Sequence, residues 1–226
     1  HSDTHSFPTR RSSDLTSPET IREMANADCV VTNFCWDDKL VFPGPRLGGR
    51  YITPAAIAAA VDLNLTNAPS SIIRYMVHGG LAMFWPEAAS PGVHAPCDVP
   101  FDYDVSFVGQ KKGRRELFIN ALRKEGIEVH TCGLHWPGGA VSQAEMVEMY
   151  SRSRINLGFS GIGHSKKLMC LKGRDFELPM SGGLYLTRHN PELERVYELG
   201  EEILTYENAA DCAETIRDML SNPEKA

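Results

Sequence analysis

The sequence contains no apolar run that approaches the roughly 20 residues needed to cross a membrane as a helix. It lacks the basic excess typical of nucleic-acid-binding or anionic-membrane-binding proteins, because its formal net charge is −6. It has no internal repeat, and no Cys or His residues stand at the spacing typical of zinc ligands. These absences argue against a membrane-spanning, nucleic-acid-binding or zinc protein. We therefore expect no bound metal ion and no cofactor.

The cysteines also lack the pattern of a disulfide framework. None of the six forms a C-x-x-C pair, and all are far apart: Cys29, Cys35, Cys97, Cys132, Cys170 and Cys212. Widely spaced cysteines in a chain of ordinary globular composition, with 42% hydrophobic and 23% charged residues, indicate reduced thiols. The sequence therefore predicts a cytoplasmic protein.

The first 15 residues differ in character from the rest. They read HSDTHSFPTRRSSDL, which is polar, basic and aperiodic. The string FPTRRSSDL resembles a translated sequencing adapter, so we interpret residues 1–15 as a non-native segment and expect upstream protein sequence to be missing. A transit peptide is the alternative, although Asp3, Asp14 and the lack of an amphipathic pattern do not favour it.

From Ser17 onward, predicted helices and strands alternate. Strands are expected at 29–34, 61–66, 81–85, 105–109, 127–131, 154–159, 184–187 and 203–206, and helices at about 17–25, 54–60, 69–78, 114–125, 142–153, 172–181, 190–200 and 209–220. This rhythm predicts the α/β class, with parallel sheets covered by helices. Four prolines between residues 86 and 100 indicate a linker.

The linker divides the chain into two Rossmann-like lobes. Residues 16–86 are predicted to form an incomplete N-terminal lobe. Residues 87–101 form the linker, and residues 102–226 form a complete C-terminal lobe.

Two predicted loops after strands could accept an anion, because ligands of parallel sheets bind at the carboxyl ends of strands. Gly109 and Lys111 lie between a strand and the start of a helix, where backbone N–H groups favour negative charge. Gly161 and His164 belong to a second Gly- and Lys-rich loop, which follows the strand at 154–159. A solvated basic turn is the alternative for the first loop, and an exposed loop histidine is the alternative for His164.

A third segment carries the strongest set of polar groups. Lys172, Arg174 and Glu177 stand near a helix start, and Gly182 and Gly183 follow that helix. The guanidinium of an arginine suits a diphosphate, and a carboxylate can accept two hydrogen bonds from ribose hydroxyls. An amphipathic surface helix with a glycine stop explains the same residues.

A family resemblance gives this segment a more specific interpretation. The runs KGRDFELPMSGGLYL, NPELERVYELGEEILTYENAADCAETIRDML and YDVSFVGQKKGRRELFINALRKEGIEV resemble the group 1 glycosyltransferases of the GT-B fold, in particular their spore-maturation-protein-like branch. The resemblance extends over nearly all of residues 17–226. It implies an enzyme that transfers a sugar from a nucleotide-sugar donor to an acceptor of unspecified chemistry. It also implies that residues 16–86 form the acceptor side and that residues 102–226 bind the nucleotide sugar.

The resemblance also implies residue roles. Glu177 would bind the nucleotide ribose, Lys172 and Arg174 would stabilise the diphosphate leaving group without a metal, and Gly182–Gly183 would pass close to the donor. Many relatives carry a second Glu eight positions before Glu177, where this sequence has Met169.

Three other positions have two interpretations each. Asp38 follows a predicted strand and is a candidate catalytic base or a loop cap. The run from Asp102 to Asp104 matches a D-x-D metal motif, although it lies at the start of a strand. Trp136 either stacks on the nucleoside base or anchors its own loop.

Glycosyl transfer is the function that these patterns favour. The alternatives are a nucleotide-sugar epimerase on the same architecture and a non-catalytic nucleotide-binding fragment. In each case the expected partner is a nucleotide-sugar or nucleotide, and no nucleic acid or transmembrane segment is expected.

Overall fold

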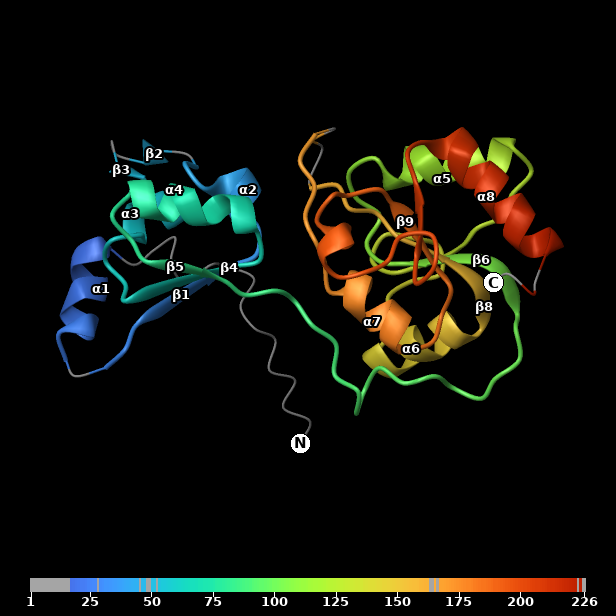
Figure 1. Cartoon of the computed structure of the whole chain (residues 1–226), viewed down its shortest axis with the longest axis horizontal. Helices are drawn as coiled ribbons and strands as arrows, with labels where there is room; N and C mark the ends of the chain where they lie inside the picture. Colours follow the sequence, from blue (N-terminus) through green and yellow to red (C-terminus); the bar gives the residue numbers. More distant parts are fainter. Residues whose placement is uncertain are drawn as a thin grey trace. The chain divides into compact units, whose positions relative to one another are not determined.

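The computed structural model describes residues 17–27, 29–44, 46–47, 50–51, 53–162, 165, 167–222 and 224. The segment predicted to be adapter-derived and the candidate residue His164 lie outside these residues. The chain separates into two compact units, His1–Pro86 and Glu87–Ala226 (Figure 1). Within the described residues, no helix combines the length and apolar character that crossing a membrane requires. All six cysteines lie in the described part and are free thiols, as the sequence predicted.

The first unit is built around a small parallel sheet. The strand order is β1 (Thr32–Cys35), β4 (Leu63–Thr66) and β5 (Ala82–Phe84). The helical elements are α1 (Pro18–Ala25), α2 (Asp38–Val41), α3 (Pro54–Ile57), η2 (Pro69–Ser71) and α4 (Ile72–Val77), and β2 (Arg46–Leu47) pairs with β3 (Arg50–Tyr51). Helices α3 and α4 cover one face of the sheet (Figure 1), where Phe42, Ala58 and Tyr75 form a buried cluster.

The second unit contains a five-stranded sheet in which every strand pair is parallel. Its order is β10 (Leu204–Tyr206), β9 (Tyr185–Arg188), β8 (Ser153–Leu157), β6 (Tyr103–Val108) and β7 (His130–Cys132). The helical elements are α5 (Arg115–Lys124), α6 (Gln143–Ser151), α7 (Arg174–Met180), the 3₁₀ turn η3 (Leu193–Arg195) and α8 (Ala209–Ser221).

Helices cover both faces of this sheet (Figure 1). Successive strand residues point to opposite faces, so Phe107 packs with the α5 and α8 residues Ile119 and Ile216, whereas Val108 belongs to the cluster of Tyr150 in α6 and Leu178 in α7. A sheet that is buried on both faces explains why its strands read as nearly continuous apolar runs. The predicted α/β class, with parallel sheets covered by helices, is confirmed.

Most predicted elements occur within a few residues of their expected bounds, and one helix is wrong. The capping box at the start of α6 is present, because Ser142 and Glu145 exchange hydrogen bonds. The helix expected at 190–200 is reduced to the 3₁₀ turn η3. Asn190 Oδ1 accepts a local hydrogen bond from the N–H of Glu192 (3.2 Å), and Val196 leaves the helical region with φ −122°.

The segment predicted to be a linker contains no helix or strand and belongs to the second unit. The N–H of Cys97 donates to Ser151 Oγ at the end of α6 (2.9 Å). Pro96 lies against Gly182, where an added Cβ would come within 2.9 Å of the proline ring. Residues 87–101 therefore pack on the sheet unit that follows them.

Candidate functional site

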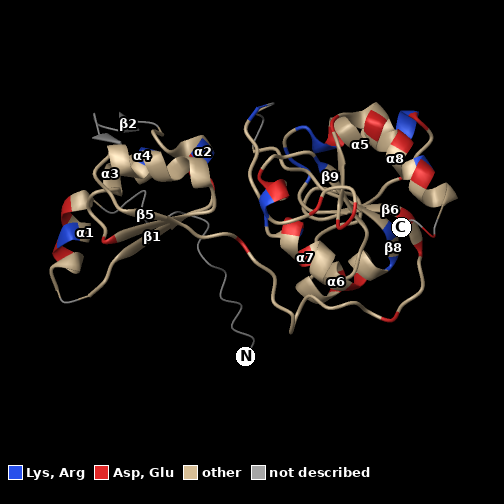
Figure 2. Cartoon of the chain, viewed as in Figure 1, with Lys and Arg blue, Asp and Glu red and all other residues tan. Residues whose placement is uncertain are grey.

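The strand order of the second unit defines one edge where a ligand would bind. From β6 the chain moves to β7 on one side and then returns to β8 on the other. The loops after β6 and β8 therefore leave the sheet in opposite directions. In open parallel sheets this arrangement opens a crevice at the carboxyl ends of the two strands. Figure 2 shows Lys and Arg residues gathered beside α5 and β9 in this unit.

The loop after β6 is held by two close backbone approaches. Gly109, with φ +152°, donates its N–H to the carbonyl of Cys132 (2.8 Å). Gly133, with φ +122°, packs so tightly that an added Cβ would lie 2.4 Å from the Gly109 carbonyl oxygen. Only glycine adopts these backbone conformations without strain, so both positions depend on it.

Trp136 also holds the loop after β6 in place. Its ring is 6% exposed, and Nε1–H donates to the Gly109 carbonyl oxygen at 2.8 Å. Of the two interpretations of Trp136, the structure therefore supports the loop anchor. A buried indole that is already hydrogen-bonded offers no free face to a nucleoside base.

We expect Trp136→Phe to lower the free energy of unfolding by about 1–2 kcal/mol, because the Gly109 carbonyl loses its donor. Urea unfolding followed by circular dichroism at 222 nm measures the change. Trp85→Phe is the control, since Trp85 is 51% exposed, and we expect it to unfold like the parent chain. Equal midpoints for the two variants would contradict the anchoring role.

The amino end of α5 is available to an anion. Arg114 at its N-cap position makes no side-chain capping hydrogen bond, so the first N–H groups of this ten-residue helix are not capped by that side chain. Lys111, a predicted binding residue, pairs with Glu116 at 2.7 Å and lies 5.4 Å from the Trp136 ring centre. Part of the charge of Lys111 is therefore already offset by a carboxylate in the first turn of α5.

Arg174 extends from the first turn of α7 to the end of β6. Its Nη2–H donates to the carbonyl of Val108, and its guanidinium carbon lies 5.0 Å from the centre of the Phe107 ring. An added Cβ on Gly109 would lie 2.4 Å from Nη2, so glycine is required for this approach. The Nε atom is buried and has no hydrogen-bond partner among the described residues.

The charge of Arg174 is retained despite its surroundings. Burial by itself would lower the pKa of the guanidinium, but the nearby Tyr150, Tyr185 and Asp175 together raise the pKa above its ordinary value. Arg174 is therefore a fixed cation at the carboxyl edge of the sheet.

Arg115 forms the second cation of this edge and was not among the predicted site residues. Its guanidinium carbon lies 5.4 Å from the Phe107 ring and 5.9 Å from the Phe159 ring. Burial, and then the charge of Arg174, lower the pKa of Arg115 to about 10. In the described part of the chain neither arginine has a carboxylate within salt-bridge distance. Two guanidinium groups that share an aromatic ring and lack a carboxylate partner have the chemistry that suits an anion.

The start of α7 is ordered by a buried carboxylate. Asp175 accepts hydrogen bonds from the N–H of Lys172 (2.7 Å) and from the hydroxyl of Tyr185 (2.5 Å). Burial raises the pKa of Asp175 above the usual range, although both hydrogen bonds act in the opposite direction. The Lys172 ammonium lies 3.3 Å from Cys170 Sγ. Asp175 therefore holds the segment that carries Lys172 and Arg174.

Glu177 lies one turn further along α7 and is partly exposed. An added Cβ on Gly173 would lie 3.0 Å from Glu177 Oε1, so the absence of a side chain at Gly173 leaves room for this carboxylate. The structure thus gathers Gly109, Arg115 and Arg174 at the end of β6, and Glu177 lies one turn along α7 from Arg174.

The family of the chain follows from its C-terminal half. The model of the family described as "Glycosyl transferase-like" matches residues 114–226, which is half of the sequence. The chain belongs to this glycosyl transferase-like family. The match includes α5 with Arg115 and α7 with Arg174 and Glu177. Among the functions considered from the sequence, glycosyl transfer is the one that this family shows.

Solved structures show the same fold for this glycosyltransferase. The chain is similar to the crystal structures of Anabaena Alr3699/HepE in complex with UDP and in complex with UDP and glucose. In each comparison the TM-score is 0.64 and the identity is 10%, over 92% of this chain and 68% of the HepE chain. This likeness shows the GT-B type of α/β fold. No curated protein sequence matches the chain.

The loop after β8 lines a cavity. Gly161 forms an isolated bridge with Met169, and the other predicted residue of this loop, His164, lies outside the described residues. A cavity of about 430 Å³ extends beside the loop. Its lining combines cationic and aromatic side chains with Gly161: Lys112, Arg115, Phe118, Phe159 and Arg188.

Gly182 and Gly183 are not brought to this edge. They follow the last turn of α7, and a helix of seven residues spans about 10 Å. An added Cβ on Gly183 would lie 2.8 Å from Asn156 Nδ2 and 3.2 Å from the Tyr150 carbonyl oxygen. The two glycines therefore allow α7 to turn closely over α6 and β8 at the amino-terminal edge of the sheet.

Asp38 lies in the first unit and is fully buried. Its carboxylate accepts hydrogen bonds from Thr66 Oγ1 (2.5 Å) and Ser71 Oγ (2.8 Å), which connect α2 with β4 and η2. The role of catalytic base stays a prediction. The observed hydrogen bonds give Asp38 a structural task in this unit.

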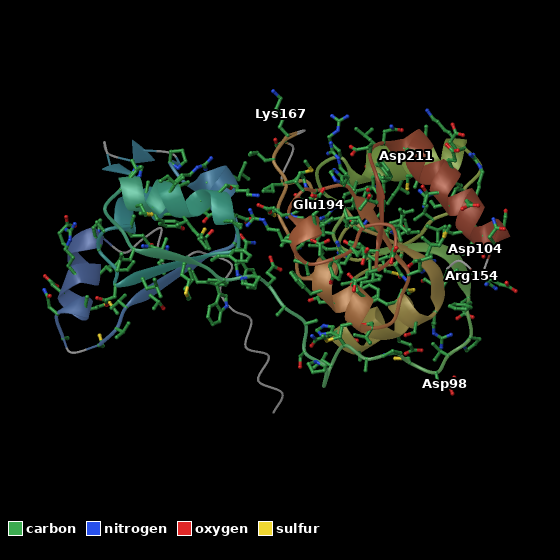
Figure 3. All side chains as sticks on the ribbon, viewed as in Figure 1. Asp98, Asp104, Arg154, Lys167, Glu194 and Asp211 are labelled. Carbon is green, nitrogen blue, oxygen red and sulfur yellow. The ribbon has the colours of Figure 1, made fainter. Side chains whose placement is uncertain are left out.

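The D-x-D sequence lies at the amino end of β6, away from the candidate site. Asp102 pairs with Arg152, and Asp104 lies 3.4 Å from Arg154. Figure 3 shows Asp104 beside Arg154 at one side of the unit and Lys167 of the β8 loop at the other. Among the described residues, no group of three or more Cys, His, Asp or Glu side chains could hold a metal ion.

Proposed function

We propose that this glycosyltransferase binds the nucleoside diphosphate of its donor at the carboxyl edge of the second unit, between β6 and β8. The observation that carries the proposal is the pair of Arg115 and Arg174 on the Phe107 ring, with no carboxylate partner in the described part of the chain. The start of α5 adds partial positive charge at the same edge. We further propose that the chain belongs to the spore-maturation-protein-like branch, on the sequence runs that resemble it.

The two arginines would act on the leaving group. When the bond between the sugar's anomeric carbon and the diphosphate oxygen breaks, negative charge grows on that oxygen. Arg115, Arg174, Lys172 and the N–H groups of α5 stabilise this charge, so we propose that no metal ion is needed. The acceptor hydroxyl forms the new glycosidic bond and gives up its proton to a base. Glu177 would accept the hydrogen bonds of the ribose hydroxyls.

UDP is the first probe of this site, because the structural neighbour HepE was crystallised with UDP. We expect differential scanning fluorimetry with a panel of nucleoside diphosphates and nucleotide sugars to reveal at least one that raises Tm by several degrees. A ligand at 100 times its Kd stabilises the folded state by about 2.7 kcal/mol. If no member of the panel at millimolar concentration shifts Tm, the proposed donor site is wrong.

Metal independence has its own test. We expect the affinity for UDP, measured by calorimetry, to be the same in EDTA and in magnesium chloride, because arginines supply the positive charge. A tenfold or larger loss of affinity in EDTA would contradict this part of the proposal.

A further inference from the structure

A buried histidine lies close to Glu177, the candidate ribose-binding residue. His94, in the segment between β5 and β6, is 5% exposed. Its Nδ1 accepts a hydrogen bond from the backbone N–H of Ser90 (3.0 Å), which places the proton of the neutral ring on Nε2. Nε2 is buried and has no hydrogen-bond partner among the described residues. An unpaired buried donor is costly, so its position calls for an explanation.

The atom nearest to a partner for Nε2 belongs to Glu177. The distance from His94 Nε2 to Glu177 Oε1 is 4.0 Å, about 1 Å longer than a hydrogen bond. Gly173 keeps the space beside the carboxylate open, because an added Cβ there would lie 3.0 Å from Glu177 Oε1 and 3.1 Å from Glu87 Oε2. Glu177 is partly exposed, whereas His94 is buried.

We propose that His94 is a positioning residue for Glu177. When a nucleotide ribose binds, a small rotation of the Glu177 side chain brings Oε1 within hydrogen-bond distance of the Nε2–H of His94. This hydrogen bond fixes the carboxylate, and its remaining lone pairs accept the 2′- and 3′-hydroxyls. The proposal rests on the proposed function, in which Glu177 binds the ribose. It also makes the segment at 87–101 a part of the donor site.

Two substitutions separate the two ring nitrogens of His94. In His94→Asn, the amide oxygen can replace Nδ1 as the acceptor for Ser90, but nothing reaches Glu177. In His94→Gln, the longer side chain places an N–H donor near the position of Nε2. Gly92→Ala is the control, because Gly92 is exposed two residues away and an added Cβ meets no atom closer than 3.9 Å.

Calorimetry with UDP on the full chain gives the first result. We expect His94→Asn to weaken UDP binding by about 5- to 20-fold, less than the loss of a direct hydrogen bond to a charged group, because His94 acts on the ribose only through Glu177. His94→Gln should lie within about threefold of the parent, and Gly92→Ala should be unchanged. An unchanged affinity in His94→Asn would overturn the proposal, as would an equal loss in the Gln and Asn variants.

Two further measurements distinguish positioning from a general structural role. In a Glu177→Ala background, His94→Asn should cause no additional loss. With 2′,3′-dideoxy-UDP, which lacks the ribose hydroxyls, His94→Asn and the parent should bind equally. A loss that persists in either experiment would overturn the proposal. If Glu177→Ala alone leaves UDP affinity unchanged, the ribose-binding role in the proposed function fails instead.

Discussion

The Arg174→Ala variant should bind UDP about 1.5–3 kcal/mol more weakly than the parent chain, which is a loss of roughly 10- to 150-fold. Arg174 is held against Val108, Phe107 and Gly109 at the end of β6, so its cation is already positioned before the ligand arrives. Removing it takes away a charge-assisted hydrogen bond to the diphosphate and leaves Arg115 as the remaining arginine of the pair. Isothermal titration calorimetry measures the difference directly.

A matched arginine and a shortened ligand complete this experiment. Arg217 in α8 is exposed and pairs with Glu125, so Arg217→Ala should leave UDP affinity unchanged. Uridine, which has no phosphate, should bind the parent and Arg174→Ala equally, because the proposed contact is with the diphosphate. An unchanged affinity for UDP in Arg174→Ala would reject its assigned role. A similar loss in both variants would indicate a long-range charge effect.

The second large effect is expected at Gly133, which packs against Gly109 in the loop after β6. We expect Gly133→Ala to lower the free energy of unfolding by about 2–4 kcal/mol. About 1 kcal/mol comes from placing alanine at φ +122°. The rest comes from a Cβ that would lie 2.4 Å from the Gly109 carbonyl oxygen and 2.6 Å from its carbon, atoms of a backbone that cannot rotate away. Urea unfolding of the full chain measures the loss.

Gly139 provides the control for the backbone contribution. It also has a positive φ of +71°, but an added Cβ there meets no atom within 4 Å. Gly139→Ala should therefore cost only about 1 kcal/mol. Because Gly133→Ala displaces Gly109, it should also weaken UDP binding, whereas Gly139→Ala should not. If the two variants lose equal free energy of unfolding, the clash of an added Cβ at Gly133 with Gly109 does not contribute to the loss.

The sequence carries much of the information about elements and little about which elements meet. The α6 capping box and the alternation of strands and helices are local features, and the structure confirms both. A local 3₁₀ turn replaced the helix expected at 190–200, because the backbone leaves the helical region at Val196, where φ is −122°. Periodicity alone does not predict this early end.

The site residues divide in the same way. A helix start that carries Arg174 and Glu177 is visible in the sequence, and the structure places Arg174 at the end of β6. Arg115 was missed because its importance arises from sharing Phe107 with an arginine that is 59 positions further along the chain. His94 was missed because a proline-rich segment was interpreted as a linker. Both depend on contacts distant in sequence, which no local pattern encodes.

A crystal structure of the chain with UDP tests the central claim most directly. The account predicts that the diphosphate lies between the first turn of α5 and the guanidinium groups of Arg115 and Arg174, with the ribose hydroxyls on Glu177. UDP bound at the amino-terminal edge of the sheet, beside Gly182 and Gly183, would contradict it.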